Sequence, residues 1–347
     1  MLFILLTRTT SITLNQLLAR DFDMMDRILR LPKRLVWKVL GRLSRPIKAS
    51  VWYKSKFVDF NHQIYPDNVW YREHDERNFE VVNLGSSGGK WAFDWAAAGV
   101  KGMNWAQQPQ TLTDDFRLLR NFHSILKKDG IVVITIMPFS GLNKKTGVMD
   151  TFKYLETLYW DVQQELPYLA EAQRLRSYPI LFGKPAIRAG IKHLLGREKT
   201  AVDVRLTLDH NPMTLEELER DAENWMRGWA RQFGISDFEA PLTQENQAGR
   251  EVRIQIMRDL VDFIVERGYR SVYVIPPVEP HLAARFTPRF RELYITSFLK
   301  EVGRPVKLLD YTNDSNFCSA DYYFNSFFLN KKGRELFTQR VWRDLQK

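Results

Sequence analysis

Short apolar runs alternate with amphipathic stretches along much of the chain. Runs rich in β-branched residues are typical of strands buried on both faces of a sheet, whereas apolar residues recurring every three or four positions predict helices. The expected strands are residues 79–84, 100–105, 131–137, 271–275 and 306–309. The expected helices are residues 91–98, 113–127, 149–165, 214–232, 245–267, 287–302 and 331–345. This alternation predicts an α/β fold: a three-layer α/β/α sandwich around a mostly parallel sheet.

The alternation is interrupted over residues 141–243, where only helical patterns occur, so we expect a helical insertion there. The α/β domain then spans residues 61–347, preceded by a basic extension over residues 1–60. In parallel α/β sheets, ligands bind beyond the carboxyl ends of the strands. The segments expected along that edge are 85–89, 138–140, 276–281 and 310–314.

The extension carries most of the charge. Residues 1–60 contain twelve Lys and Arg against four Asp, within a formal net charge of +10 for the whole chain of 347 residues. Its apolar residues recur at helical spacing: Ile28, Leu31, Leu35, Val39 and Leu43. Since Pro32 and the Ser44-Arg45-Pro46 string are helix breakers, a basic amphipathic helix is predicted over about 33–44.

Two interpretations of this helix remain open. It lies on an anionic membrane surface through residues 24–56, or it packs its apolar face on the body and exposes its cations to water. Nucleic acid is not an expected partner, because the rest of the chain has no basic stripe and no nucleic-acid-binding motif.

Composition excludes several other classes. The single cysteine, Cys318, rules out an internal disulfide framework and a cysteine-based metal cluster. No His, Asp or Glu residues have metal-ligand spacing, so neither a metal nor another cofactor is expected. The first apolar run, Leu2–Leu6, is too short for a membrane span and lacks a basic segment before it. We therefore expect a cytoplasmic or peripheral membrane protein without a signal peptide or transmembrane helix.

The string Gly85-Ser86-Ser87-Gly88-Gly89 carries the most distinctive chemistry. It lies where a buried strand turns into a helix, so a serine hydroxyl can be exposed beside outward-pointing backbone N–H groups. This arrangement suits a nucleophile with an oxyanion site, and it is equally compatible with an ordinary glycine-rich turn. A phosphate-binding loop is less favoured, because the string lacks a following Lys-Ser/Thr and the GxGxxG spacing.

The wider string Asn83–Ser87 resembles the first block of the SGNH/GDSL hydrolase superfamily, in the branch of the D-alanyl-lipoteichoic acid biosynthesis D protein and surface-polysaccharide locus proteins. Residues 102–106, with Gln110 and Asp114, resemble the second block, and residues 131–140 the third. Residues 321–333 resemble the final block, including its Leu-Asn-x-x-Gly ending. The resemblance covers about residues 79–140 and 270–345.

The resemblance implies an O-acyl esterase or acyltransferase fold in which Ser87 is the nucleophile. It places Ser86, Gly88 and Asn104 around the substrate, which would be a glycan or another acylated carbohydrate of the bacterial cell envelope.

The catalytic positions of the final block depart from the family pattern. Asn325 stands in place of the family Asp and Phe328 in place of the family His. A phenylalanine cannot accept a proton, and a serine hydroxyl is a poor nucleophile without an adjacent base. The third-block Asn is also missing, since residues 138–140 read Pro-Phe-Ser, and Gly88 replaces a common histidine.

Three hypotheses about function follow. The first is an SGNH-like protein of surface-polysaccharide metabolism that has lost its catalytic His and Asp. The second is an active serine esterase or acyltransferase that uses Ser87 with an unconventional base, for which His281 after an expected strand is the best-placed histidine. The third is a non-catalytic glycan-binding or membrane-associated scaffold.

Overall fold

The computed structural model describes residues 33–48, 78–107, 109–142, 146–152, 154–155, 158, 160–197 and 208–347. The side chains of Lys33, Arg34, Met149 and Phe152 are not described. The chain divides into two compact units. Unit 1 comprises Met1–Tyr53 and Leu175–Glu198, and unit 2 comprises Lys54–Arg174 and Lys199–Lys347. Predictions on residues 1–32 and 49–77 lie outside the described residues.

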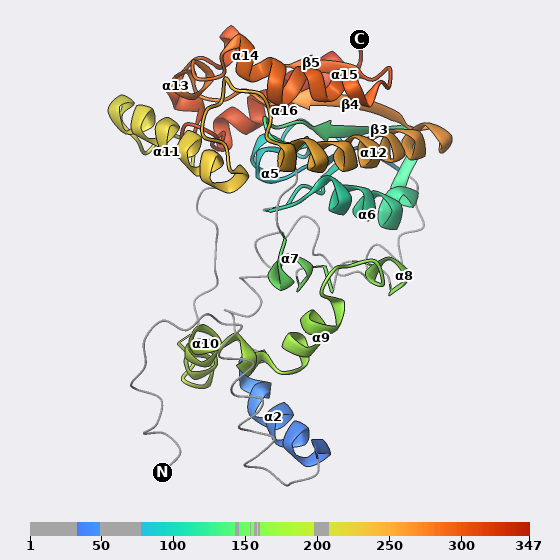
Figure 1. Ribbon diagram of the computed structural model, residues 1–347, viewed down its shortest axis with the longest axis vertical. Coiled ribbons are helices and arrows are strands. Elements are labelled where there is room, and N and C mark those ends of the chain that lie inside the picture. The colour runs from blue at the N-terminus through green and yellow to red at the C-terminus, as the bar shows by residue number, and fades with distance from the viewer. Residues whose placement is uncertain are drawn as a thin grey trace. The chain divides into compact units, whose positions relative to one another are not determined.

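Unit 2 contains a five-stranded parallel sheet in the order β2-β1-β3-β4-β5 (Figure 1). The strands are β1 (Phe79–Leu84), β2 (Gly102–Asn104), β3 (Leu126–Thr135), β4 (Arg270–Ile275) and β5 (Lys307–Asp310). The chain runs outward from β1 to β2 and then crosses back to β3 on the other side of β1. The strand order therefore reverses between β1 and β3, which makes that point of the carboxyl edge the expected ligand crevice.

The helices of unit 2 connect and cover these strands. They are α5 (Ser87–Ala92), α6 (Leu112–Phe122), α7 (Val148–Phe152), α8 (Trp160–Gln163), α11 (Leu215–Phe233), α12 (Gln244–Glu266), α13 (Pro280–Ala283), α14 (Pro288–Arg291), α15 (Ser297–Val302) and α16 (Lys331–Leu345). Helix α9 (Leu169–Ser177) spans the boundary between the units. Shorter turns are η2 (His123–Ile125), η6 (Ser315–Phe317), η7 (Ala320–Tyr322) and the π-helical η5 (Glu292–Thr296).

Alternating side chains of the strands fill two cores, one on each face of the sheet. Val82, Val132 and Tyr273 pack with α6, α12 and α15 on one face. Their neighbours Val81 and Val133 pack with α5 and α16 on the other face. The α/β fold with helices on both faces of a parallel sheet is therefore confirmed. A third, largely aromatic cluster at the carboxyl edge joins α11, α13 and α14 to the loops that follow the strands.

All five expected strands are present, and the long helices α11, α12 and α16 match their predicted ranges to within one residue at each end. Helix α11 begins with a capping box in which Thr214 and Glu217 exchange hydrogen bonds, as the sequence indicated.

Three predicted helices in unit 2 have the wrong extent. Expected helix 91–98 begins earlier, at Ser87, and ends at Ala92. Expected helix 113–127 ends at Phe122, because Leu126 already pairs with Phe79 in the sheet. Expected helix 149–165 is not continuous, since α7 and α8 are separate short helices. For the second of these helices, pairing of the backbone in the sheet outweighs a locally helical pattern.

The described part of unit 1 consists of α2 (Lys33–Lys48), η3 (Pro179–Phe182) and α10 (Lys184–Leu194) (Figure 1). The predicted stop at Ser44-Arg45-Pro46 is wrong, because α2 continues through Pro46 to Lys48. The buried Ile47 lies against Gly190 of α10, where any added Cβ would overlap its side chain. This contact holds the last turn despite the hydrogen bond that a proline cannot donate.

Helix α2 packs through a face other than the expected one. Trp37 contacts Tyr178, with ring centroids 4.6 Å apart, and Ser44 is fully buried. The aliphatic side chains of Leu35, Val39 and Leu43 are instead 46%, 50% and 57% exposed. No helix in the described parts of either unit is both long and apolar enough to cross a bilayer.

Candidate functional site

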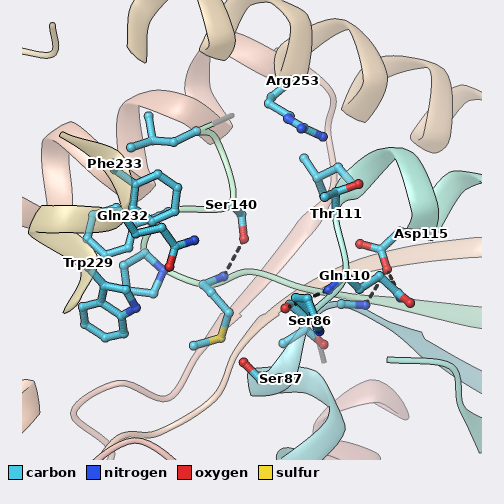
Figure 2. Close-up of a pocket in the computed structure, with 18 of the residues that line it drawn as sticks. Ser86, Ser87, Gln110, Thr111, Asp115, Ser140, Trp229, Gln232, Phe233 and Arg253 are labelled. Atoms are coloured by element: carbon cyan, nitrogen blue, oxygen red, sulfur yellow. Dashed lines mark hydrogen bonds between the residues drawn. The ribbon is translucent and has the colours of Figure 1, made fainter. Parts of the chain in front are cut away.

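A pocket of about 370 Å³ opens at the carboxyl edge of the sheet where the strand order reverses. Its lining comes from the loop after β1, the loop after β3, the start of α6 and the end of α11 (Figure 2). Figure 2 shows Ser86, Gln110 and Asp115 on one side and Trp229, Gln232 and Phe233 on the other. The volume lies within the range of small-molecule sites.

The glycines after β1 let this loop approach β3 closely. Gly85 has a φ of +136°, and a Cβ there would lie 2.8 Å from the Cβ of Thr135. A Cβ at Gly88 would overlap the sulfur of Met137. Because a side chain at Gly85 would be strained and one at Gly88 would displace Met137, the glycine string lets Ser86 and Ser87 lie at the pocket between β1 and β3.

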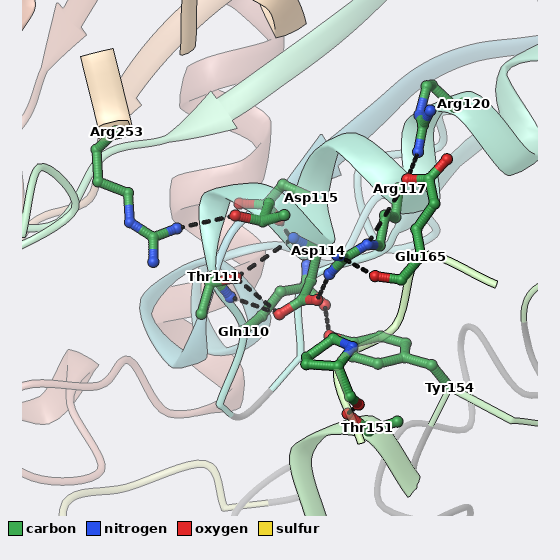
Figure 3. Close-up of polar contacts among 12 residues, drawn as sticks. Gln110, Thr111, Asp114, Asp115, Arg117, Arg120, Thr151, Tyr154, Glu165 and Arg253 are labelled. Atoms are coloured by element: carbon green, nitrogen blue, oxygen red, sulfur yellow. Dashed lines mark hydrogen bonds and ion pairs between the residues drawn. The ribbon is translucent and has the colours of Figure 1, made fainter. Parts of the chain in front are cut away.

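The polar side of the pocket is a network of buried hydrogen bonds centred on Asp115 (Figure 3). One Asp115 oxygen accepts from the Gly85 N–H at 2.8 Å and from the Gln110 side-chain amide at 2.6 Å. The Gln110 amide oxygen accepts from the Tyr154 hydroxyl at 2.9 Å, and the Gln110 N–H donates to the Ser86 hydroxyl at 3.2 Å. These bonds fix the loop after β1 to the start of α6.

Asp114 makes different contacts from Asp115. It forms a capping box with Thr111 at the start of α6 and an ion pair with Arg117 at 2.9 Å. The sequence analysis assigned Asp114 to the second block, whereas Asp115 is the residue that contacts the loop after β1.

A cation also borders the pocket. Arg253 of α12 is buried and donates to the Thr113 hydroxyl at 3.1 Å. Burial lowers the pKa of the Arg253 guanidinium, and the nearby carboxylates of Asp114 and Asp115 oppose that change. The polar side of the pocket therefore combines amide, hydroxyl and guanidinium donors.

The opposite side of the pocket is aromatic. Trp225, Trp229 and Phe233 recur every four residues along α11, so they lie on one side of the helix. Phe139 stacks on Phe233 with ring centroids 5.0 Å apart. Phe327 lies 4.8 Å from Trp225 and 5.0 Å from Trp229, centroid to centroid. Together these rings form a wall of apolar faces opposite the hydroxyls.

Ser87 lies at the first position of α5 and lines the pocket with a partly exposed side chain. Its hydroxyl forms no hydrogen bond to any residue that the structure describes. Thr135 at the end of β3 lines the same pocket, and its buried hydroxyl likewise has no partner within the described part of the chain. The Ser87 hydroxyl is therefore available to a ligand, whereas the Thr135 hydroxyl is closed off from solvent.

The final-block loop reaches the pocket, but its family catalytic positions serve packing. The side-chain oxygen of Asn325 accepts from the N–H groups of Phe327 and Phe328, at 3.0 and 2.8 Å, which closes a tight turn. Phe328 is only 2% exposed and packs between Trp91 and Trp225. Phe327 lines the pocket beside Ser87, whereas Phe328 lines a separate, smaller cavity.

His281 is paired, but it does not line the pocket of Ser87. Its Nδ1 lies 2.8 Å from an oxygen of the buried Glu279, whose other oxygen accepts from the His281 N–H and so caps α13. The Glu279 N–H donates to the Ser326 carbonyl at 3.0 Å, which ties this turn to the final-block loop.

The three remaining predicted substrate contacts lie in three different places. Ser86 lines the pocket together with Ser87, while Gly88 borders the smaller cavity. Asn104 lies outside both, and its buried amide is used inside the fold. The amide nitrogen donates to three carbonyls at the end of α5, and the oxygen accepts from Asn83 at 2.7 Å. Its position supports a structural task in joining β1, β2 and α5.

Most of the pocket outside the glycine string was not predicted from the sequence. The four-residue spacing of Trp225, Trp229 and Phe233 was a usable signal, but the acidic residues at the start of α11 indicated a solvated helix. Nothing local distinguished Asp115 from Asp114 or Arg253 from other arginines of α12. Within the described residues, no group of three or more His, Cys, Asp or Glu side chains is arranged to hold a metal ion.

No protein-family model matches this chain, and no curated protein matches it in sequence. The similarity to SGNH hydrolases therefore remains a prediction carried by the motifs alone.

Proposed function

We propose that the pocket beside Ser87 binds an acylated carbohydrate and that this protein does not hydrolyse it. The proposal rests on the residues that surround the Ser87 hydroxyl. The hydroxyl has no partner among the described residues, and none of the described residues lining the pocket is a histidine. Nucleophilic catalysis by serine needs a base within hydrogen-bond reach.

The two sides of the pocket support a carbohydrate as the ligand. Sugar rings present hydroxyls at their edges and C–H groups on their faces. The hydroxyls match the donors and acceptors of Ser87 and Gln232, and the faces match Trp225 and Trp229. A small number of placed polar groups against an apolar lining is the general form of a specific ligand site. The acyl group and the cell-envelope origin come from the resemblance to SGNH hydrolases.

Calorimetric titration with an O-acetylated oligosaccharide and with its deacetylated form tests this proposal. We expect the acetylated form to bind, and Gln232→Ala to weaken binding by about fivefold, the usual loss for one hydrogen bond. Gln232 lines the pocket and is exposed, so its substitution leaves the fold intact. Proton NMR of the same mixture should show no released acetate. Acetate release by the wild type that Ser87→Ala abolishes would establish the active esterase instead.

A further inference from the structure

Unit 1 carries the whole net charge of the protein. Its residues, Met1–Tyr53 and Leu175–Glu198, include fifteen Lys and Arg against four Asp and Glu, a net charge of +11. The remainder of the chain has thirty-six Lys and Arg against thirty-seven Asp and Glu. In the described part of the unit, residues 33–48 and 175–197, there are eleven cations and no carboxylate side chain.

The same two helices expose most of their large aliphatic residues to solvent. The side chains concerned are Leu35, Val39 and Leu43 of α2 and Ile187, Ile191, Leu194 and Leu195 at α10, each at least 41% exposed. They are seven of the fourteen large apolar side chains that are exposed in the described parts of the chain. Apart from Ile47 of α2, the buried residues described in these helices are small: Ser44 of α2 and Ala186, Ala189 and Gly190 of α10.

Cations flank both aliphatic stripes. On α2, Lys38 and Arg42 lie one turn apart beside Leu35 and Val39. On α10, Arg188 and Lys192 have the same four-residue spacing beside Ile191. All four cations are exposed. A narrow aliphatic stripe bordered by Lys and Arg is the pattern of helices that lie in the interface of an anionic membrane.

We propose that unit 1 docks on an anionic lipid bilayer through both α2 and α10. Aliphatic side chains enter the headgroup boundary, and the cations meet lipid phosphates. The participation of α10 extends the surface beyond the N-terminal segment, to a region some 140 residues further along the chain. The proposal is independent of what the pocket of unit 2 binds.

Other partners fit this surface less well. A nucleic acid would satisfy the cations, but its phosphate backbone offers no apolar surface to seven aliphatic side chains. A second copy of the chain would cover the aliphatic residues, but it would bring a second unit of net charge +11 into contact with the first. A bilayer that contains anionic lipid meets both requirements.

Flotation with lipid vesicles tests the surface, using the full chain and two pair variants. Lys38→Glu with Arg42→Glu alters α2, and Arg188→Glu with Lys192→Glu alters α10. The control, Lys300→Glu with Arg343→Glu, makes the same change of charge at exposed residues of unit 2. The vesicles contain phosphatidylcholine with phosphatidylglycerol, or phosphatidylcholine alone. Circular dichroism confirms that each variant is folded.

We expect the wild type and the control to float with the phosphatidylglycerol vesicles and not with phosphatidylcholine alone. Each pair variant should partition at least about thirty-fold less, since one Lys or Arg near an anionic surface changes partitioning about fivefold. Raising the salt concentration should release the wild type. Leu35→Gln with Leu43→Gln should weaken binding at every salt concentration.

Three results would overturn the proposal. The first is a wild type that does not bind anionic vesicles. The second is an α10 pair variant that binds as well as the wild type, which would leave α10 outside the surface. The third is a duplex oligonucleotide that binds the protein tightly and displaces it from the vesicles at equal charge concentration.

Discussion

The two sides of the pocket beside Ser87 are built by opposite means. On one side, hydrogen bonds among Gly85, Gln110 and Asp115 fix the loop after β1. On the other side, the rings of Trp229 and Phe327 pack with almost no polar contact between them. The resemblance to SGNH hydrolases predicts the nucleophile on the first side, whereas Phe328, which stands in place of the family base, lines the smaller cavity. The side of the pocket that holds Ser87 is thus polar, and aromatic packing forms the facing side.

The loop of residues 325–328 keeps a tight turn although its residues differ from the Asp-x-x-His pattern. Asn325 still closes the final-block turn, because an amide oxygen accepts backbone N–H groups as a carboxylate does. Asn330 caps α16 by accepting from the Gly333 N–H, and a Cβ at Gly333 would overlap the Tyr322 carbonyl. The framework residues are therefore explained by packing and capping alone.

The largest effect on stability is expected on the aromatic side. Trp229→Ala removes a buried ring that contacts Phe139, Trp225 and Phe327. We expect the free energy of unfolding to fall by about 3–5 kcal/mol, the usual cost of removing a buried tryptophan. Urea denaturation followed by circular dichroism measures this. A loss below about 1 kcal/mol would mean that the aromatic side is not a packed core.

Substitution of Asp115 on the polar side should lower the free energy of unfolding by less. The loss should depend on one side-chain oxygen of Asp115. Asp115→Ala leaves two buried donors, the Gly85 N–H and the Gln110 amide, without their acceptor. We expect the free energy of unfolding to fall by about 2–3 kcal/mol, and by less in Asp115→Asn, which retains an oxygen. The matched control is Asp114→Ala, which removes the second side chain of the capping box and its ion pair with Arg117, at a cost of about 1 kcal/mol. Equal losses for the two alanine variants would contradict the network centred on Asp115.

Features set by residues close together in the sequence could be predicted, whereas features set by tertiary packing could not. The strands and α12 follow from runs and periods that each segment carries by itself. The polar loop was found because Gly85 and Ser87 form a recognisable string. Trp229 and Arg253 were missed, because their positions at the pocket depend on how α11 and α12 cross the sheet edge. That geometry is set by contacts distant in sequence.

The smallest effect, on ester hydrolysis, is expected from introducing at positions 325 and 328 the residues that the resemblance implies. Asn325→Asp with Phe328→His rebuilds the Asp-x-x-His block, but Phe328 lines the smaller cavity and not the pocket of Ser87. We therefore expect no gain in hydrolysis of p-nitrophenyl acetate over the wild type. Phe327→His is the informative partner, because residue 327 does line the pocket. If one of these variants gains hydrolysis that depends on Ser87, we expect it to be Phe327→His.

The Ser87 hydroxyl has no partner among the described residues, so we expect that no group in this pocket activates it. Labelling with a serine-reactive fluorophosphonate, followed by mass spectrometry of the intact protein, tests it most directly. An unactivated serine hydroxyl does not displace fluoride, so the wild type should gain no more phosphonyl mass than Ser87→Ala. Stoichiometric labelling of the wild type at Ser87, absent from Ser87→Ala, would contradict the claim and assign the pocket to an active serine hydrolase.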